Sequence, residues 1–260
     1  MFCRPEVLLR YKADTDKYRI RHRSIECRGV WHLQSFDINE EGQVFTYLGD
    51  LARLPYDEQL HWKAHNEAPR APISRRALKT DFEGDFAFDE YDPLESLKQR
   101  LHEWDRRKVA WWTLRAAKSP DRVQYPVTTS ADEWANELMN VHQFLVEGFE
   151  EVRLRERATT PGATPDPRWR SLKLIEACLM RWGFDEERAR AITAPFHQLH
   201  DLRIKVKGHA SGKDAAKMQR EAIAKYGSYR KHFEALCAGC DESVRIVDEL
   251  FAAEWGTTGR

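Results

Sequence analysis

The stretch "LHDLRIKVKGHASG" (residues 199–212) decides how the second half of the chain folds. Leu199 and Leu202 stand three residues apart, which is the spacing of neighbours on one face of a helix. Gly208 follows three cationic residues and can take the left-handed backbone conformation that ends a helix. Cationic side chains in a last turn also interact favourably with the helix dipole. The stretch therefore predicts a helix that ends near Gly208, and its basic end has an ordinary structural explanation.

A second interpretation of the same stretch is a phosphate-binding site made of Arg203 and His209. On an unbroken helix, six positions separate two side chains by about 120° around the axis and about 9 Å along it. The pair would meet at one phosphate if Gly208 ends the helix and turns His209 around, or if a two-fold axis joins two copies here. The sequence leaves both routes open.

Such a pair would support RNA cleavage without a metal. RNA supplies its own nucleophile, the 2′-OH, so an enzyme needs a base for that proton and positive donors for the charge that grows on the phosphate. His209 titrates in the useful pH range, and Arg203 can hold two phosphate oxygens at once. Holding a phosphate without cleaving the chain is the alternative role for the same two residues.

The charge around the pair is basic, although the chain as a whole is neutral. Lys+Arg and Asp+Glu each number 42, which argues against a protein that coats nucleic acid non-specifically. Residues 200–232 hold nine Lys or Arg and three Asp or Glu, a local net charge of +6. We expect Lys205, Lys207 and Lys213 to bind the RNA backbone.

Around this stretch, the chain after residue 130 is predicted to be all-helical. Ser130 and Glu133 form a capping box at the start of the first helix. Apolar residues then recur at helical spacing at Trp134, Leu138, Val141, Leu145, Phe149 and Val152. A second helix is predicted to stop at Gly183. Pro195 is predicted to kink or restart the third helix, and Gly227–Ser228 is predicted to interrupt the last one. Four or five helices in residues 130–256 indicate a bundle.

The first part of the chain is predicted to be a small domain rich in β-structure. Segments 17–27, 30–38 and 43–49 alternate apolar and polar residues, as strands of an antiparallel meander do, and 54–66 follows as a short helix. An acidic loop over 81–95 leads into a helix at 93–104. We therefore predict an α+β protein with an N-terminal domain at 1–108, a connector at 109–129 that carries Trp111 and Trp112 as a brace between the halves, and the helical bundle at 130–256.

The segment 199–212, placed between the third and fourth predicted helices, resembles the R-x(4–6)-H motif of the HEPN superfamily. That resemblance covers residues 130–255 and carries Arg203 and His209 over as the motif pair. It implies a helical-bundle domain that dimerises and a composite site in which arginine and histidine meet across the dimer. Many members are metal-independent endoribonucleases of toxin–antitoxin and antiviral defence systems. The residue after the arginine is commonly polar in active members, and here it is Ile204.

The resemblance implies a dimeric endoribonuclease in which His209 is the general base and Arg203 stabilises the phosphate. Such an enzyme should arrest growth when it is expressed. The alternative is a non-catalytic dimerisation or RNA- or nucleotide-binding module that acts with a partner protein such as an antitoxin. The N-terminal segment "YLGDLARLPYDEQLHWKAHNEAPRAPIS" (47–74) resembles part of large uncharacterised bacterial proteins. For residues 1–108 we infer a role in sensing a trigger or recruiting RNA.

Other signals in the sequence have structural explanations. Cys237 and Cys240 form a single CxxC inside an amphipathic helix, which indicates core packing, and His61 and His65 share a helix face without an obvious third metal ligand. The chain has no P-loop, GxGxxG or GxSxG motif, so we expect no nucleotide cofactor and no metal. The absence of a long apolar run or signal peptide and the odd number of cysteines predict a cytoplasmic protein with no membrane contact.

Overall fold

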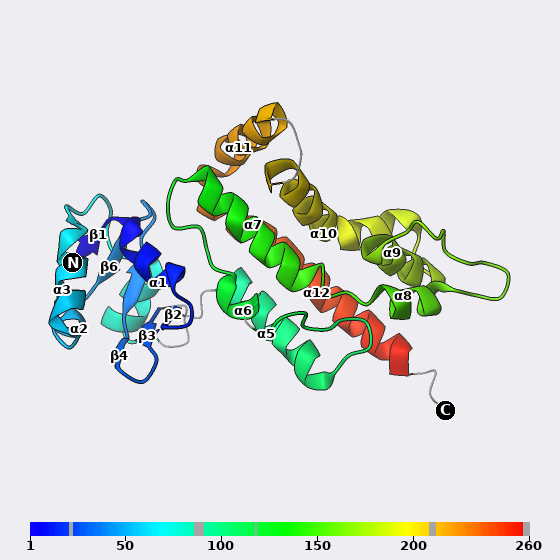
Figure 1. The fold of residues 1–260 in the computed structure, drawn as a ribbon, viewed down its shortest axis with the longest axis horizontal. Helices are drawn as coiled ribbons and strands as arrows, with labels where there is room; N and C mark the ends of the chain where they lie inside the picture. The colour runs from blue at the N-terminus through cyan, green and yellow to red at the C-terminus, as the bar shows by residue number, and fades with distance from the viewer. Residues whose placement is uncertain (21–22, 86–90, 118, 208–211, 257–260) are drawn as a thin grey trace. The chain divides into compact units, whose positions relative to one another are not determined.

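The structure is a computed structural model that describes residues 1–20, 23–85, 91–117, 119–207 and 212–256. The chain divides into two compact units, Met1–Asp92 and Pro93–Arg260, called here the N-terminal unit and the helical unit. The named strands lie in the N-terminal unit, and the helical unit is built from helices (Figure 1). The α+β class predicted from the sequence is therefore confirmed.

Short strands and helices alternate in the N-terminal unit. The strands form two sheets, with the orders β5-β6-β1-β7 and β2-β3-β4, and their neighbours pair antiparallel. The strands are β1 (Phe2–Cys3), β2 (Tyr18–Ile20), β3 (Ile25–Cys27), β4 (Trp31–Leu33), β5 (Phe36–Ile38), β6 (Val44–Thr46) and β7 (Asn66–Glu67). The helices are η1 (Pro5–Leu8), α1 (Leu9–Ala13), α2 (Leu48–Leu51), α3 (Tyr56–Ala64), α4 (Arg75–Ala77) and η2 (Leu78–Phe82).

The meander predicted from segments 17–27, 30–38 and 43–49 is wrong in its connectivity. Segment 17–27 holds two strands that pair with each other, β2 and β3, and segment 30–38 divides between the two sheets. β1, at the chain start, pairs with both β6 and β7. Two-residue strands such as β1 and β7 carry no alternation that a sequence pattern could detect, so the pairing that joins the chain start to residues 66–67 has no local signal.

A polar network stabilises the core of the N-terminal unit. The Glu58 carboxylate is buried and accepts a hydrogen bond from the Tyr11 hydroxyl at 2.7 Å. Trp62 Nε1 in turn donates to the Tyr11 hydroxyl at 3.0 Å, and Arg10 lies 3.3 Å from Glu58. Buried polar groups of this kind are tolerated because each has a partner. The network ties α1 to α3 and accounts for the helix predicted at 54–66.

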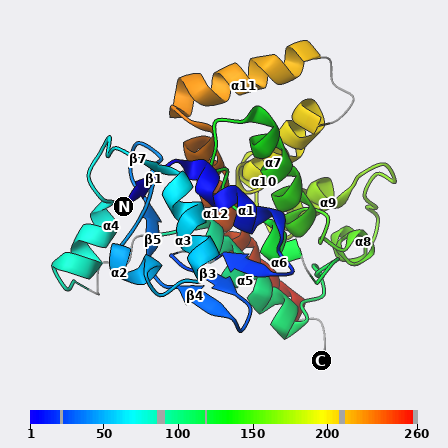
Figure 2. The same ribbon diagram turned by 60° about the vertical axis from the view of Figure 1, so that its left-hand side comes forward.

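Eight helices are described in the helical unit. They are α5 (Pro93–Arg107), α6 (Ser119–Arg122), α7 (Ala131–Leu145), α8 (Glu151–Ala158), α9 (Ser171–Arg181), α10 (Glu186–Lys207), α11 (Gly212–Tyr226) and α12 (Tyr229–Gly256). α10 packs against α7, α9, α11 and α12, and α12 also packs against α5. Figures 1 and 2 show α7 alongside α12, and α11 (orange) lies at the end of the unit toward which α10 runs.

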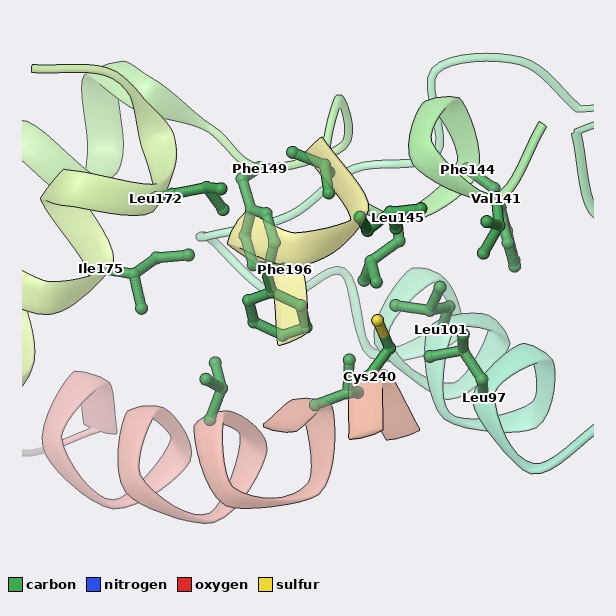
Figure 3. Packing of buried hydrophobic residues seen from close by; sticks show 14 of the residues in the cluster. Leu97, Leu101, Val141, Phe144, Leu145, Phe149, Leu172, Ile175, Phe196 and Cys240 are labelled. Atoms are coloured by element: carbon green, nitrogen blue, oxygen red, sulfur yellow. The ribbon is translucent and has the colours of Figure 1, made fainter. Parts of the chain in front are cut away.

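One continuous hydrophobic core joins these helices. Figure 3 shows Phe149 and Phe196 next to each other, with ring centroids 5.7 Å apart. Leu172 and Ile175 of α9 lie on one side of this pair, and Leu97, Leu101 and Cys240 from α5 and α12 lie on the other. Cys237 and Cys240 are both buried, and Cys240 Sγ lies 3.8 Å from the Pro195 carbonyl oxygen. Their interpretation as packing residues is confirmed.

The division between the units differs from the predicted boundary. It falls at Asp92–Pro93, ahead of both the predicted limit at residue 108 and the predicted connector at 109–129. The reason is α5, whose residues Leu94, Leu97, Leu101 and Trp104 are buried in the core of the helical unit. Trp111 and Trp112 belong to the same core, so they are no brace between the halves.

Polar contacts fix α5 on α12. The buried Asp241 accepts hydrogen bonds from Ser96 Oγ at 2.9 Å and from Arg100 Nε at 2.8 Å. Two turns further along α12, Asp248 accepts a hydrogen bond from Trp104 Nε1 at 2.8 Å and also pairs with Arg107. Two acidic residues of α12 thus satisfy both ends of α5, which explains why this helix leaves the acidic loop before it and joins the bundle.

The helix predicted to run from Trp134 to Val152 ends at Leu145. Residues Trp111–Thr113 pass beside the turn that follows: Thr113 N donates to the Gly148 carbonyl, and Glu150 N donates to the Trp111 carbonyl, both at 2.9 Å. Val152 therefore belongs to a new helix, α8, and its side chain is 68% exposed. The apolar spacing across 145–152 is real in the sequence, but a neighbouring segment occupies the hydrogen bonds that would continue α7.

Local stop and start signals of the helices are mostly as predicted. The Ser130 side chain accepts from Glu133 N at the start of α7, although the Glu133 carboxylate bonds to Val127 and Thr128. Gly183 and Gly227 both have positive φ, 93° and 82°, directly after α9 and α11. α10, however, continues through Pro195 instead of restarting there. Among the described residues, no helix combines the length and the apolar character that crossing a membrane requires.

Candidate functional site

The predicted phosphate-binding arginine lies near the end of α10. Arg203 is half-buried, and among the described residues no carboxylate lies within ion-pair distance of it. Lys205 on α10 and Lys213 in the first turn of α11 are exposed. Lys207 is the last residue of α10. His209 falls within 208–211, outside the described residues, so the geometry of the Arg203–His209 pair is not described.

Several cations at this end of the helical unit have no carboxylate partner among the described residues, unlike many other cations in the molecule. Many arginines and lysines pair with a neighbouring carboxylate, as Arg190 does with Glu186 at 2.5 Å at the other end of α10. In the part of the chain that the structure describes, Arg203, Lys205, Lys213 and Arg220 have no such pair. Cations without a carboxylate partner can attract polyanions, so these four side chains are available to a negatively charged ligand.

Two histidines face each other beside Arg203. His142 of α7 is 4% exposed, and its Nε2 lies 3.0 Å from Nδ1 of His200 on α10. On its other side, His142 Nδ1 lies 3.4 Å from the Glu147 carboxylate in the turn after α7. Because His200 and Arg203 are three residues apart on a helix, they share a face of α10. The three groups Glu147, His142 and His200 therefore form a row that ends one turn before Arg203.

The environment of His142 keeps its imidazole neutral. Burial, which is the largest cause, and the nearby His200 and Arg203 together lower the pKa of His142 to about 3. A cationic imidazole here would lose hydration and meet another positive charge. His142 is consequently a neutral hydrogen-bonding group over the whole physiological range.

This lowered pKa predicts a pH-dependent stability. The unfolded chain protonates His142 near pH 6.5 and the folded protein only near pH 3, so between these values the unfolded state binds more protons and stability falls as pH falls. We expect the wild-type free energy of unfolding to decrease by about 1.4 kcal/mol per pH unit more steeply than that of His142→Gln. Urea unfolding at pH 6 and pH 5 measures both slopes, and equal slopes would contradict a buried neutral imidazole.

Another histidine of α10, His197, is held by a buried carboxylate. Oε1 of Glu176 lies 2.8 Å from His197 Nε2 and accepts a hydrogen bond from Thr193 Oγ1 at 3.0 Å. The other carboxylate oxygen, Oε2, accepts from Lys173 Nζ at 2.7 Å. Burial raises the pKa of Glu176, but the hydrogen bonds from His197, Lys173 and Thr193 outweigh it and bring the pKa to about 2. Glu176 is therefore ionised and orients the His197 ring.

These imidazoles line a cavity of about 760 Å³, a size typical of small-molecule and cofactor sites. His142, His197 and His200 contribute from α7 and α10, and Val146, Phe149, Val152, Trp169 and Leu172 add apolar surface. Arg115, Arg168, Arg170 and Lys173 bring positive charge, balanced in part by Glu147, Glu150 and Glu151. The cavity can thus hold a group with both a flat apolar part and a charged part.

The histidine row was not predicted from the sequence, although part of its signal is local. His200 stands three residues after His197 and three residues before Arg203, so it shares a helix face with each of them. His142 has no such signal, because it lies 58 residues from His200 along the chain. His61 and His65, considered from their spacing, bond to the backbone carbonyls of Val7 and His61 at 2.9 Å each.

The histidine row, the cavity and the unpaired cations around Arg203 all lie on α10 and the elements that contact it. In the part of the helical unit that is described, these are the features whose chemistry goes beyond packing. Comparison of the chain with protein-family models, curated proteins and solved structures found no match.

Proposed function

We propose that this protein is a metal-independent endoribonuclease and that its helical unit is a HEPN-like domain. The observation that carries the proposal is the position of Arg203: half-exposed near the end of α10, without a carboxylate partner among the described residues, directly before the connection that holds His209. The exposed cations Lys205 on the same helix and Lys213 and Arg220 on α11 support a polyanionic substrate. Residues 203 and 209 also match the family's motif spacing.

In this proposal, catalysis uses the RNA's own 2′-OH. His209 takes the proton of the 2′-OH, the 2′-oxygen attacks the phosphorus, and the bond to the 5′-oxygen breaks, leaving a 2′,3′-cyclic phosphate. Arg203 stabilises the negative charge that develops on the phosphate oxygens. Lys205, Lys207 and Lys213 hold the flanking backbone. A homodimer that brings two such helix ends together gives the composite site that the resemblance implies.

RNA cleavage in the presence of EDTA tests this proposal. Purified wild type should cleave total RNA, and Arg203→Ala and His209→Ala should each lower the rate by about 10²-fold or more, because each removes a group that acts in the transition state. Arg190→Ala is the matched control, since Arg190 lies on the same helix but pairs with Glu186. Cleavage by either motif variant at the wild-type rate, or cleavage that EDTA abolishes, would refute the scheme.

A non-catalytic module that binds RNA or a nucleotide beside a partner protein is the second candidate. Ile204, directly after Arg203, is 41% exposed and apolar, where active members of the family that the segment resembles commonly have a polar residue, and this favours the non-catalytic candidate. Such a module would bind RNA in an Arg203-dependent way without cutting it, and its partner would be an antitoxin or another component of a defence system. Expression separates the two: an active toxin arrests growth and His209→Ala does not.

We also propose a cytoplasmic location. The five cysteines are all buried and none forms a disulfide, as is usual in a reducing compartment. A ribonuclease of the toxin or antiviral type finds its RNA there. The N-terminal unit would then contact the trigger or the RNA that directs the helical unit.

A further inference from the structure

The row Glu147–His142–His200 has the arrangement of a carboxylate-supported proton relay. Its two links measure 3.4 Å, from the Glu147 carboxylate to His142 Nδ1, and 3.0 Å, from His142 Nε2 to His200 Nδ1. The Glu147 side chain is 44% exposed, whereas that of His142 is 5% exposed. The row therefore runs from solvent, through a buried imidazole, to His200 at the cavity.

The proton positions follow from the partners. His142 Nδ1 lies in a buried position without a well-aligned hydrogen-bond partner, and the nearest charged group is the Glu147 carboxylate. A carboxylate attracts an N–H, so the proton of the neutral His142 belongs on Nδ1. Its Nε2 is then an acceptor, and His200 must donate from Nδ1. This leaves His200 Nε2 as the nitrogen that is available to a ligand in the cavity.

His200 is also well placed with respect to the proposed phosphate clamp. His200 and Arg203 stand on one face of α10, so their β-carbons are about 5–6 Å apart. The hydrogen bond to His142 holds the His200 ring through Nδ1 and leaves Nε2 for a ligand. Trp169, in the wall of the cavity that His200 lines, offers apolar surface to a base.

From this geometry we propose that His200 is the general acid of the ribonuclease site, and this inference rests on the proposed function. The 2′-oxygen attacks the phosphorus while its proton passes to His209. As the bond between phosphorus and the 5′-oxygen breaks, His200 Nε2 gives its proton to that oxygen, so the leaving nucleotide departs as an alcohol. His200 is neutral after the step and regains a proton from water, with Nδ1 held by His142 throughout. His142 and Glu147 are positioning residues.

An RNA substrate with sulfur in place of the leaving 5′-oxygen tests this role. A thiolate leaves without needing a proton, so the substitution relieves the loss of a general acid and not the loss of a general base. His200→Ala should cleave the ordinary RNA about 10²- to 10⁴-fold more slowly than wild type and the sulfur-substituted RNA within about tenfold of it. His209→Ala should be slow on both substrates, and Glu147→Gln should show a smaller loss that sulfur also relieves.

His102→Ala is the matched control, since His102 is an exposed histidine of α5. It should cleave both substrates as wild type does. If His200→Ala is equally slow on both substrates, or as fast as wild type on ordinary RNA, the general-acid role is overturned while the proposed function stands. If wild type cleaves neither substrate, the ribonuclease proposal itself fails and this inference fails with it. Circular dichroism unfolding midpoints of the variants exclude misfolding as the cause of a loss.

Discussion

A fragment that begins at Pro93 should fold cooperatively, and one that begins at Val109 should not. The difference is α5, which buries Leu94, Leu97, Leu101 and Trp104 against the remaining helices. Removal of one buried leucine or tryptophan side chain costs about 2–5 kcal/mol, and the total stability of a domain is about 5–15 kcal/mol. Loss of all four at once therefore exceeds what the remaining helical unit can tolerate.

The hydrogen bonds between α5 and α12 also predict that the fragment without α5 is unstable. Asp241 is 3% exposed, and in the shorter fragment it would lose both Ser96 and Arg100. Hydrogen bonds to a charged group contribute about 1.5–3 kcal/mol each, so the shorter fragment also loses this stabilisation. The apolar face that α12 presents to α5 would also become exposed and would favour aggregation.

Thermal and urea unfolding followed by circular dichroism measures this prediction. Residues 93–260 should show one sigmoidal transition, whereas residues 109–260 should show low helicity and no cooperative transition. Asp241→Ala within the longer fragment should lower its stability by about 1.5–3 kcal/mol while keeping the transition. Equal unfolding midpoints for the two fragments would mean that α5 is dispensable and that the boundary lies in the segment 109–129.

The helical unit could be predicted from the sequence where its signals are local. The leucine spacing of α5, the Ser130 cap and the glycine stops at Gly183 and Gly227 each act within one or two turns, and the structure has each of them. The prediction failed where a segment distant in sequence decides the outcome. α7 ends before Val152 because residues 111–113 occupy the next turn's hydrogen-bonding groups.

The same distinction holds for the candidate site. Arg203 and the basic excess around it could be read from one stretch, because charge and helical spacing are local properties. The relation between His142 and His200 could not, since it depends on how α7 packs against α10. The sequence placed α5 with the N-terminal half for the same reason: its partners Asp241 and Asp248 stand more than 140 residues further along the chain.

The largest effect of a single methyl group is expected at Gly148. A Cβ at this position would lie 2.1 Å from Nε1 and 2.5 Å from Cε2 of Trp112, far inside the closest approach of non-bonded atoms. The φ of Gly148 is not positive, so the backbone accepts other residues and the effect of Gly148→Ala is steric. Trp112 therefore has to move, or the turn after α7 does.

The packing around Trp112 opposes a movement of its ring. The Trp112 ring is 2% exposed, its Nε1 donates to the Leu145 carbonyl at 2.9 Å, and it packs against the rings of Trp104 and Phe144. Overpacking a dense core costs about 1–3 kcal/mol, and more where the neighbours cannot shift. We expect Gly148→Ala to lower the free energy of unfolding by about 3 kcal/mol or more, as measured by urea unfolding.

Gly239→Ala is the matched comparison in the same unit. Its Cβ would meet Pro195 Cγ at 3.2 Å, a tight contact that a small shift relieves, and alanine is favoured over glycine inside a helix by about 1 kcal/mol. The net change there should be within about 1 kcal/mol of zero. If Gly148→Ala behaves like Gly239→Ala, the close approach of Trp112 to the turn is wrong.

A double-mutant cycle identifies the cause of the loss at Gly148. Trp112→Phe removes the ring atoms that the new Cβ would strike, and by itself it destabilises the core through lost volume and a lost hydrogen bond to Leu145. In the double variant, part of the space vacated by the indole receives the methyl group. The two losses should therefore be less than additive by about 1 kcal/mol or more. Strict additivity would show that the loss at Gly148 does not come from the contact between the new Cβ and the ring at position 112.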